Sequence, residues 1–436
     1  MHLGTPHMSA AAATHAPANS PARVLTASLV GTAIEFYDFY IYATAASLVF
    51  GPLFFPASSP GAQLLLAYAT FGLAFLARPL GAWVFGHFGD RVGRKSTLVA
   101  SLLLMGGSTT LIAFLPTYHT MEQFGIGWIA PLLLCILRFG QGIGLGGEWG
   151  GAALLAVENA PPHMRARFGM FPQLGAPVGF IAANGLFLIL GYTLTAEQFM
   201  DWGWRLPFLF SAALVAVGLW VRLKLSETEQ FKAALAESAP VKVPMAELFR
   251  RHLPATIAGT FSAVVCFAIF YLATAFALGY GTKTLGFTKE AFLTIQLGAI
   301  LFLALGIILA GWWSDLKTPR FVLLAGCVGT VFVGLLLAPM LEAKDTASVF
   351  AWLALALLLM GFVYGPLGAF LPSLFPPHVR YTGSSLTFHV AGIIGAAPVP
   401  MVAQYLAERG GLAYVGYYLS AAAIVSLIAL FFARAR

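Results

Sequence analysis

Long apolar segments, separated by short polar connections, occupy most of this sequence. An α-helix needs roughly 20 apolar residues to cross a bilayer, and one segment after another reaches that length. Six of them precede a polar stretch at residues 224–252, and six follow it. The pattern predicts an all-α integral membrane protein with twelve transmembrane helices, near residues 25–50, 63–86, 96–116, 128–157, 170–193, 204–223, 254–280, 291–313, 320–341, 347–371, 383–407 and 411–433.

The polar segments define the expected domains. Residues 1–24 are rich in Ala, Pro, Ser and His and lack the basic start of a signal peptide, so we expect a disordered cytoplasmic tail. Residues 25–223 form the expected N-terminal six-helix half, and residues 253–436 form the C-terminal half. The polar stretch at 224–252 is the expected cytoplasmic linker between the halves.

Composition supports a membrane protein and excludes several other classes. Only 9% of the residues are charged, against about 25% in soluble domains, and the mean hydropathy is +0.84. The net charge of +7 does not indicate nucleic-acid binding, because Lys and Arg recur in alternate loops instead of forming one face. The three cysteines lie in apolar segments without metal-ligand spacing, so we expect neither a metal nor a cofactor. The loops on one side hold few bases, which predicts that both termini are cytoplasmic; these bases are Lys283, Lys289, Lys344 and Arg409.

Two short charged clusters occupy corresponding places in the two halves. Gly86–Lys95 (GHFGDRVGRK) follows the second apolar segment, and Gly311–Arg320 (GWWSDLKTPR) follows the eighth. Each places an acid and then bases between two long apolar runs. Charged residues are rare in this chain, so the repetition predicts a duplicated architecture with two pseudo-symmetric halves.

Several motifs carry a resemblance to a known family. The stretch Gly86-x-x-x-Asp90-Arg91-x-Gly93-Arg94-Lys95 matches the signature loop of the major facilitator superfamily, and Arg138-Phe-Gly-Gln141-Gly142-x-Gly144-x-Gly146-Gly147 resembles a second motif. Further segments make the chain similar to the metabolite:proton symporters of that superfamily. They are Ile34-Glu35-Phe36-Tyr37-Asp38-Phe39, Ala77-Arg78-Pro79-Leu80-Gly81, Gly146-Gly147-Glu148-Trp149-Gly150-Gly151, Trp202-Gly203-Trp204-Arg205-Leu206-Pro207-Phe208 and Arg380-Tyr381-Thr382-Gly383.

The resemblance implies the major facilitator fold, in which two six-helix halves rock about a site at mid-membrane. It implies a transporter of the bacterial inner membrane and not an enzyme. Members of the symporter family carry 2-oxoglutarate, citrate, shikimate, dicarboxylates, proline or betaine. We therefore expect a small-molecule substrate, protons and the lipid bilayer as partners, and a monomer as the assembly.

The resemblance also implies a gate at the cytoplasmic side. The acid at Asp90 is expected to face the N-terminal end of helix 11, where the helix dipole favours negative charge. Arg91 belongs to the same loop, and Arg94 is expected to pair with Glu158 at the end of helix 4. Both contacts would form only when the cytoplasmic side is closed.

The second copy of the loop is degenerate. Leu316 stands where the first copy has Arg91, and Pro319 stands where it has Arg94. Asp315 is therefore expected to form a weaker counterpart of the Asp90 gate. Glu148, deep in the fourth segment, is expected to contribute a further gating pair.

Ionisable residues inside the apolar segments predict the chemistry, because each costs at least about 2.5–3.5 kcal/mol at the bilayer centre. Glu35 and Asp38 are i,i+3 neighbours on one helix. Two close carboxylates resist simultaneous ionisation, so one of them is a candidate proton carrier. The alternative is a permanent ion pair with Arg78 or Arg138. His389 is a third candidate for proton coupling, because histidine titrates near neutral pH.

Arg138 lies near the middle of its segment, where transporter substrates bind. Its planar guanidinium can grip a carboxylate in bidentate fashion, and Arg78 is a second candidate for that role. The alternative for Arg138 is an ion pair with Glu35 or Asp38 and no contact with substrate. The remaining candidate substrate contacts are polar residues within the apolar segments, namely Gln141, Tyr42, Gln173, Gln296 and Tyr364.

Together these features predict a proton-coupled importer of a small polar metabolite, in particular an organic acid. Import of a zwitterion such as betaine or proline is the alternative. The seventh segment is rich in aromatic residues, which favours packing or lipid contact but also suits a wall around a quaternary ammonium group. Export of amphipathic drugs and a membrane-embedded enzyme are weaker alternatives. The glycine-rich stretch from Gly142 to Gly151 follows no strand, so it predicts close helix packing and not a nucleotide loop.

Overall fold

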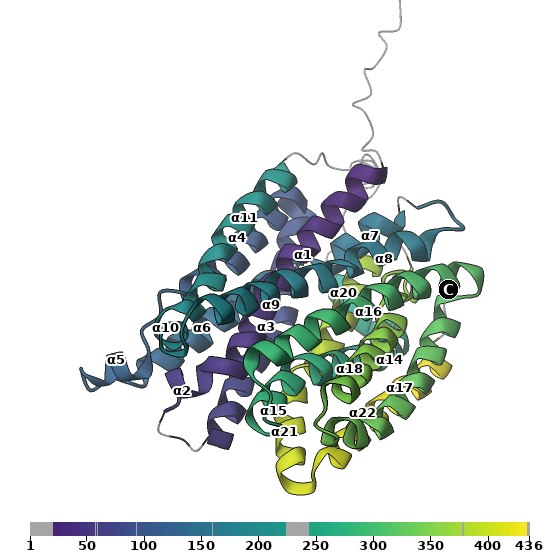
Figure 1. Ribbon diagram of the computed structural model, residues 1–436. Coiled ribbons are helices and arrows are strands. Elements are labelled where there is room, and N and C mark those ends of the chain that lie inside the picture. Colours follow the sequence, from purple (N-terminus) through teal and green to yellow (C-terminus); the bar gives the residue numbers. More distant parts are fainter. Residues whose placement is uncertain are drawn as a thin grey trace, which may run out of the picture.

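The computed structural model describes residues 21–56, 58, 60–92, 94–158, 160–223, 244–376 and 379–433, without the side chains at 21, 23, 24, 27, 86–98, 155, 222 and 244. Helices account for nearly all of these residues, and the described ranges contain no strand. The helices pack into one bundle in which the N-terminal and C-terminal segments lie side by side (Figure 1). The predicted all-α membrane architecture is confirmed.

The N-terminal half contains the first six membrane segments and three short connecting helices. Its elements are α1 (Pro21–Ala45), the π-helical turn η1 (Ala46–Phe50), α2 (Gly51–Phe54), α3 (Pro60–Val92), α4 (Arg94–Ile112), α5 (Tyr118–Glu122), α6 (Ile129–Leu145), α7 (Trp149–Glu158), α8 (Arg165–Gln173), α9 (Gly175–Thr193), α10 (Ala196–Asp201), η2 (Gly203–Arg205) and α11 (Leu206–Leu223).

The C-terminal half follows after residues 224–243, so most of the expected linker at 224–252 lies outside the described residues. So do residues 1–20 of the expected tail. The elements are α13 (Pro244–Arg251), α14 (Leu253–Tyr271), the π-helical turn η3 (Leu272–Phe276), α15 (Ala277–Lys283), α16 (Lys289–Leu316), α17 (Pro319–Glu342), α18 (Thr346–Tyr364), α19 (Leu367–Ser373), α20 (Arg380–Gly395), α21 (Val399–Gly410) and α22 (Leu412–Phe432).

Ten segments of the described chain are long and apolar enough to cross a membrane. A shorter apolar helix, Val99–Ile112, lies within α4. The run from α1 to α2 packs against α9, α11 and α3 in the same bundle. Together these segments make up the twelve that the apolar pattern predicts.

The first, fourth and fifth segments of each half are interrupted. The first segments contain the π-helical turns η1 and η3. The fourth segments break between α6 and α7 and between α18 and α19, and the fifth break between α8 and α9 and between α20 and α21. Interrupted helices leave backbone groups free at mid-membrane and mark the binding sites of many transporters. Their recurrence at corresponding places supports the predicted pseudo-symmetry.

The glycines of the fourth segment allow close helix packing. A side chain at Gly144 would collide with Met105 of α4, and one at Gly142 or Gly146 would collide with the backbone of α3. Small residues at such contacts let two backbones approach each other directly. The structure therefore confirms that this stretch serves helix packing.

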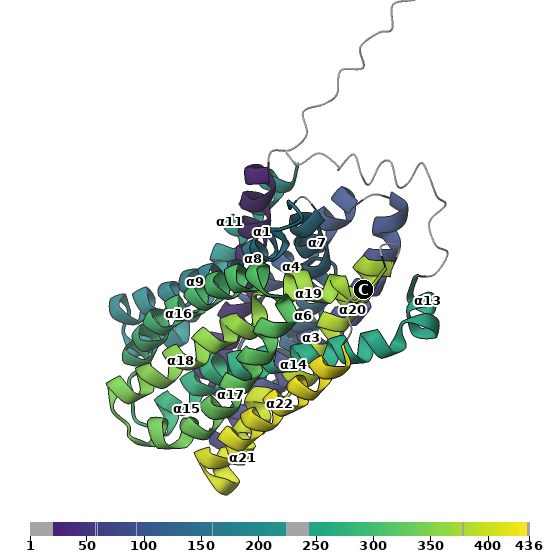
Figure 2. The ribbon, with the colours of Figure 1, turned by 90° about the vertical axis from the view of Figure 1, so that its right-hand side faces the viewer.

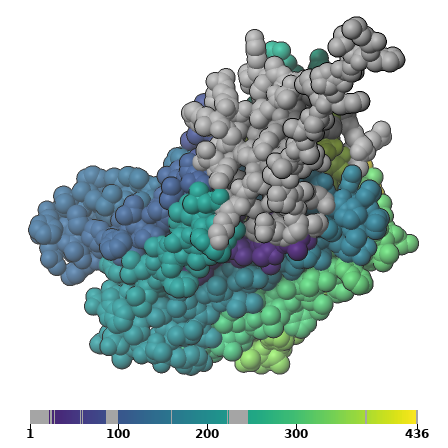
Figure 3. Space-filling model, turned by 90° about the horizontal axis from the view of Figure 1, so that it is seen from above, coloured from purple at the N-terminus to yellow at the C-terminus, as the bar shows by residue number. Residues whose placement is uncertain are grey.

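The two ends of the bundle are distinguished by the chain termini. The end where α1 begins and α22 ends also holds the connections α3–α4, α7–α8 and α16–α17, and we call it the termini end (Figures 1 and 2). Seen from that end, the purple-to-teal N-terminal half lies beside the green C-terminal half (Figure 3). The connection α19–α20 and the helix α13 lie at the termini end as well.

Candidate functional site

Asp38 lies at the centre of a polar network inside the N-terminal half. Its side chain is fully buried, and its Oδ1 accepts a hydrogen bond from Ser211 of α11 at 2.5 Å. Its backbone carbonyl accepts one from Gln141 Nε2 at 3.0 Å, and the same nitrogen donates to Thr109 of α4 at 2.9 Å. The second oxygen, Oδ2, has no hydrogen-bond partner among the described residues. A buried oxygen without a hydrogen-bond partner costs much free energy when the carboxyl group is charged and much less when the group is neutral.

Arg138 belongs to the same network and is fully buried. One guanidinium nitrogen donates to Gln141 Oε1, and the other donates to the carbonyl of Phe71 at 3.4 Å. The guanidinium carbon lies 3.9 Å from the ring centroid of Tyr42 and 4.5 Å from that of Phe39. Aromatic faces attract cations, so rings and an amide hold this charge instead of a carboxylate.

Tyr42, expected as a substrate contact, is engaged inside this network. Its hydroxyl donates to Thr70 of α3 at 2.7 Å, and its ring carries the Arg138 guanidinium. Ser211, Thr109 and Thr70 did not stand out in the sequence. Nothing in a single hydroxyl within an apolar run predicts such contacts.

Arg78 lies nearer the boundary between the two halves. Its guanidinium carbon is 4.7 Å from the centroid of Phe39 and 4.3 Å from that of Phe75. Its charge interacts with Glu35 of α1 and with Tyr271 and Tyr364 of the C-terminal half. The two carboxylates have different neighbours: Glu35 interacts electrostatically with Arg78 and with Tyr364 of the C-terminal half, whereas Asp38 is bonded to Ser211 of α11.

Buried polar side chains near this boundary carry atoms without a hydrogen-bond partner in the described part of the chain, and four of them come from four different membrane segments. They are Arg78 (Nε), Gln173 (Nε2), Tyr364 (hydroxyl) and His389 (both ring nitrogens). Segments of both halves contribute. Buried polar groups in proteins are almost always hydrogen-bonded, so a cluster of unsatisfied groups indicates a place for a polar ligand. We call these four residues the central site.

Aromatic side chains from both halves enclose the central site. Trp149 of α7 stacks on Phe388 of α20, and its indole nitrogen donates to Gln173 Oε1 at 3.4 Å. Tyr271, one of the aromatics noted in the seventh segment, packs edge-on against Phe75 at 5.6 Å. Trp149 lies within a motif that the sequence singled out, but neither its spacing nor its type indicated these contacts.

Gln296, expected as a substrate contact, is engaged by the π-helical turn η3. Its amide donates to the carbonyls of Ala273 and Thr274 at 3.0 and 2.9 Å. Both carbonyls belong to the π-helical turn η3, where the regular helical hydrogen bonds are displaced. Gln296 thus stabilises the turn through its amide nitrogen.

The halves also contact each other at the end opposite the termini. Ser47 of η1 and Tyr68 of α3 both donate to the carbonyl of Ala275 in η3, at 3.1 and 2.8 Å. The π-helical turn exposes this carbonyl, and two hydroxyl groups of the other half satisfy it. The Ser47 bond links the first segments of the two halves at their corresponding turns, and the Tyr68 bond links the second segment to the same carbonyl.

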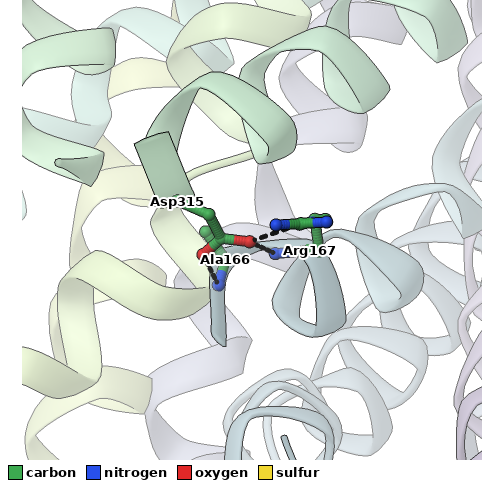
Figure 4. A network of polar contacts seen from close by, with 3 residues as sticks. All are labelled: Ala166, Arg167 and Asp315. Carbon is green, nitrogen blue, oxygen red and sulfur yellow. Dashed lines mark hydrogen bonds and ion pairs between the residues drawn. The ribbon is translucent and has the colours of Figure 1, made fainter. Parts of the chain in front are cut away.

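At the termini end, Asp315 forms the clearest contact between the halves. Its carboxylate accepts hydrogen bonds from the backbone nitrogens of Ala166 and Arg167 at 2.9 and 3.1 Å, and from Arg167 Nε at 2.9 Å (Figure 4). These nitrogens begin α8, where the helix dipole favours an anion. The acid of the second signature loop thus binds the N-terminal end of a helix in the other half, as the resemblance implies for Asp90.

The other gate candidates are only partly described. The side chains of Asp90, Arg91 and Arg94 lie outside the described residues. Glu158 is exposed at the end of α7, and Glu148 is buried and accepts a hydrogen bond from Ser101 of α4 at 2.8 Å. The Asp90 gate and its Arg94–Glu158 pair therefore stay predictions.

The chain is similar to proteins of a known family. The family model of the Major Facilitator Superfamily matches residues 28–400. This chain belongs to the major facilitator superfamily. It is a multi-pass membrane transport protein, and proteins of this superfamily are not enzymes.

Relatives support the same assignment. The chain is 49% identical to the Inner membrane metabolite transport protein YhjE of Escherichia coli K12, over 95% of this chain and 94% of that protein. It is 37% identical to the Shikimate transporter of the same organism, over 93% and 92%. It is 28% identical to the Proline/betaine transporter of Salmonella typhimurium, over 93% and 82%.

The fold is similar to that of solved transporters. The partially occluded inward-open structure of the xylose transporter XylE from E. coli superimposes with a TM-score of 0.72 at 14% identity, covering 94% of this chain and 96% of that one. At this identity the likeness concerns the fold. It confirms the predicted twelve-helix architecture.

Proposed function

We propose that this protein is a proton-coupled symporter that imports a small organic anion across the inner membrane. The single observation that carries the proposal is Asp38, a fully buried carboxyl group with one oxygen that no described residue satisfies. Such a carboxyl group is suited to bind a proton and to stay neutral while the protein changes from one open state to the other. A relative that is 49% identical is named as an inner-membrane protein, which supports the location.

Arg78 supports an anionic substrate. It is a buried cation whose Nε has no partner in the described chain, and its charge interacts with Tyr364 and His389 of the central site. The carboxylate of a substrate bound there would accept charge-assisted hydrogen bonds from the guanidinium. The other three side chains of the central site would form hydrogen bonds with hydroxyl or carbonyl groups of the same substrate. The 37% identical relative is named as a Shikimate transporter.

The two buried arginines provide a physical link between proton and substrate. Asp38 is bonded through its backbone carbonyl to Gln141, and Gln141 is bonded to Arg138. The ring of Phe39 lies within cation–π distance of both Arg138 and Arg78. A proton on Asp38 changes the charge balance of this group, and with it the attraction of Arg78 for an anion.

Orientation follows from charge. Exposed arginines gather at the termini end, among them Arg165, Arg250 and Arg251. Positive loops stay in the cytoplasm, so we propose that both termini are cytoplasmic. The proposed assembly is a monomer, because one chain supplies both halves of the central site.

The test is uptake by the purified protein in proteoliposomes with an imposed pH gradient, alkaline inside. We expect a gradient-dependent accumulation of at least one acid from a panel of citrate, 2-oxoglutarate, succinate and shikimate, and its loss when a protonophore is added. Betaine and proline belong in the same panel, because the 28% identical relative is named as a Proline/betaine transporter. Accumulation of these zwitterions alone would favour the second candidate, and no accumulation of any compound would contradict the symporter.

A second test concerns the contact in Figure 4. Asp315→Asn removes the charge that binds the start of α8 and pairs with Arg167. The closed termini end is then less stable, and we expect uptake to slow by about tenfold, the factor that corresponds to about 1.4 kcal/mol. Initial rates in proteoliposomes measure the effect.

Asp345→Asn is the matched control for this change. Asp345 also caps a helix, by accepting a hydrogen bond from the backbone nitrogen of Ser348 at 2.9 Å, but it does so within its own half. We expect its uptake rate to stay near that of the wild type. Equal rates for Asp315→Asn and the wild type would show that the Asp315 contact does not affect the cycle.

A further inference from the structure

Trp149 and Phe388 form an unusually close contact between the two halves. Their rings are parallel within 3°, and their centroids are 3.7 Å apart. Trp149 begins α7 in the N-terminal half, and Phe388 lies in the middle of α20 in the C-terminal half. Both side chains are 4% exposed. The pair therefore forms a barrier that must separate if solute is to leave the central site between α7 and α20.

The contact continues toward the termini end in two further layers. Gly150 packs against Ser385 so closely that a Cβ at Gly150 would overlap the Ser385 hydroxyl. Beyond it, Tyr381 lies along Gly151 and donates from its hydroxyl to the carbonyl of Gly147 at 2.8 Å. The break between α6 and α7 frees that carbonyl from regular helical bonding. We call the facing residues 147–151 and 381–388 the latch.

Trp149 is also a neighbour of the central site. Its indole nitrogen donates to Gln173 Oε1, whereas Gln173 Nε2 has no partner in the described residues. A side-chain amide has one acceptor end and one donor end. Only one orientation of Gln173 offers its oxygen to the indole, and that orientation leaves the NH₂ group for a ligand.

A ligand oxygen that accepts from Gln173 Nε2 selects this orientation and so fixes the indole. The indole needs that support, because parallel rings placed face to face attract each other less than offset or edge-on rings. An occupied site would hold Trp149 on Phe388, and an empty site would leave the stack weaker. The same side chain thus contacts both the substrate's hydrogen-bond partner and the latch.

We propose that Trp149 couples occupancy of the central site to closure of the latch. Binding of a solute with an oxygen acceptor orients Gln173, Gln173 orients the indole, and the indole closes on Phe388. The inference rests on the proposed function for the existence of a transported solute. The inference adds Trp149 as the residue that transmits solute binding to the latch.

The central experiment measures access to the latch with and without solute. A reporter cysteine at Gly151 fits, because a Cβ there meets only the ring of Tyr381 at 3.5 Å, an ordinary contact. The background has Cys135, Cys266 and Cys327 replaced by Ala or Ser. A membrane-impermeant maleimide is applied from the side on which the termini lie. The solute is the member of the panel citrate, 2-oxoglutarate, succinate and shikimate that the wild-type protein accumulates most strongly.

We expect that solute slows labelling in the parent protein and that Trp149→Phe removes this protection. The variant keeps a ring for stacking but loses the N–H group. Its half-saturation concentration for uptake should rise about threefold to tenfold, the effect of one lost neutral hydrogen bond, with little change in maximal rate. Phe388→Leu should raise labelling even without solute, because it removes the stacking partner.

Trp352→Phe is the matched control. Trp352 is also buried, and its indole nitrogen donates to the carbonyl of Val333 at 3.0 Å, within the C-terminal half. Its loss removes the same chemical group without touching the latch, so solute protection should persist. The proposal is wrong if Trp149→Phe retains full protection or if Trp352→Phe loses it equally.

A pair of glycine variants tests the latch without any solute. Gly150→Ala places a methyl group against the Ser385 hydroxyl, whereas the methyl group of Gly151→Ala makes only an ordinary contact with Tyr381 at 3.5 Å. In the reporter background Gly150→Ala should increase labelling at position 151, and in uptake assays Gly150→Ala should be impaired while Gly151→Ala is not. Unchanged labelling with Gly150→Ala would overturn the latch. Failure of the wild-type protein to accumulate any solute, with labelling still raised by Gly150→Ala, would instead contradict the proposed function.

Discussion

Asp38→Asn is expected to reduce proton-driven accumulation to the level of protein-free liposomes. Asparagine has nearly the same shape as aspartate, and its oxygen can still accept the hydrogen bond from Ser211. The fold and the bond from Gln141 to the backbone carbonyl of Asp38 are therefore retained. What is lost is the ability to take up and release a proton during each cycle. The measurement is uptake in proteoliposomes with and without a pH gradient.

The same variant should still exchange solute. Counterflow, in which external solute exchanges with internal solute, requires no net proton movement, so Asp38→Asn should retain much of this activity. Its exchange rate should also vary less with pH than that of the wild type. A variant that accumulates solute against a gradient as the wild type does would exclude Asp38 as the proton carrier.

Glu35→Gln is the matched comparison, because it removes a carboxylate one helical turn away. Glu35 interacts electrostatically with Arg78 and Tyr364 and therefore belongs to the side of the central site. We expect this variant to keep part of its gradient-driven uptake and to show altered substrate affinity. The reverse outcome, with accumulation lost only in Glu35→Gln, would assign the proton to Glu35.

Arg78→Gln is expected to have the second-largest effect, on substrate binding. The substitution removes the cation whose Nε is unsatisfied in the central site. Loss of a charge-assisted hydrogen bond costs about 1.5–3 kcal/mol, so the half-saturation concentration for an anionic solute should rise at least about tenfold. Arg78→Lys should restore the charge but not the two-pronged geometry, and only part of the affinity. Uptake rates over a range of solute concentrations provide the measurement.

Two further arginines separate binding from other effects. Arg138→Gln breaks the bond to Gln141, which belongs to the Asp38 network, so it should impair proton coupling more than affinity. Arg409→Gln changes an arginine that stacks on Tyr405 at the opposite end, and its transport should be normal. An unchanged half-saturation concentration in Arg78→Gln would show that Arg78 does not bind the anion.

The sequence predicted most of the fold because the membrane allows few solutions. Each apolar run near the length of a bilayer becomes a helix, since backbone groups in lipid must be satisfied within their own segment. The repeated clusters at Gly86–Lys95 and Gly311–Arg320 indicated the duplication, and the interrupted helices repeat in both halves as duplication implies. The sequence predicted the boundaries of the helices less accurately. The apolar run at 128–157 is two helices, because the glycines around Gly146 and Gly147 interrupt it.

The candidate site could be predicted only in part. Ionisable residues in an apolar run are conspicuous, so Glu35, Asp38, Arg78 and Arg138 were found from sequence alone. Their partners were not, because a buried serine, threonine or tryptophan has no signal until another helix is placed against it. Gln296 shows a further limit, since its bonds to the carbonyls of a π-helical turn had no signal in the sequence either.

The sequence by itself determined that this protein crosses the membrane repeatedly in two related halves, because hydrophobic length and charge are properties of single segments. It also determined which charges lie in the membrane. Only the tertiary structure decided that Asp38 bonds to Ser211 whereas Glu35 interacts electrostatically with Arg78 and Tyr364, and that Asp315 binds the start of α8. The stacking of Trp149 on Phe388 was decided in the same way. These contacts join segments far apart in the chain, and helix packing sets them through the rotation and depth of each helix, which no local pattern encodes.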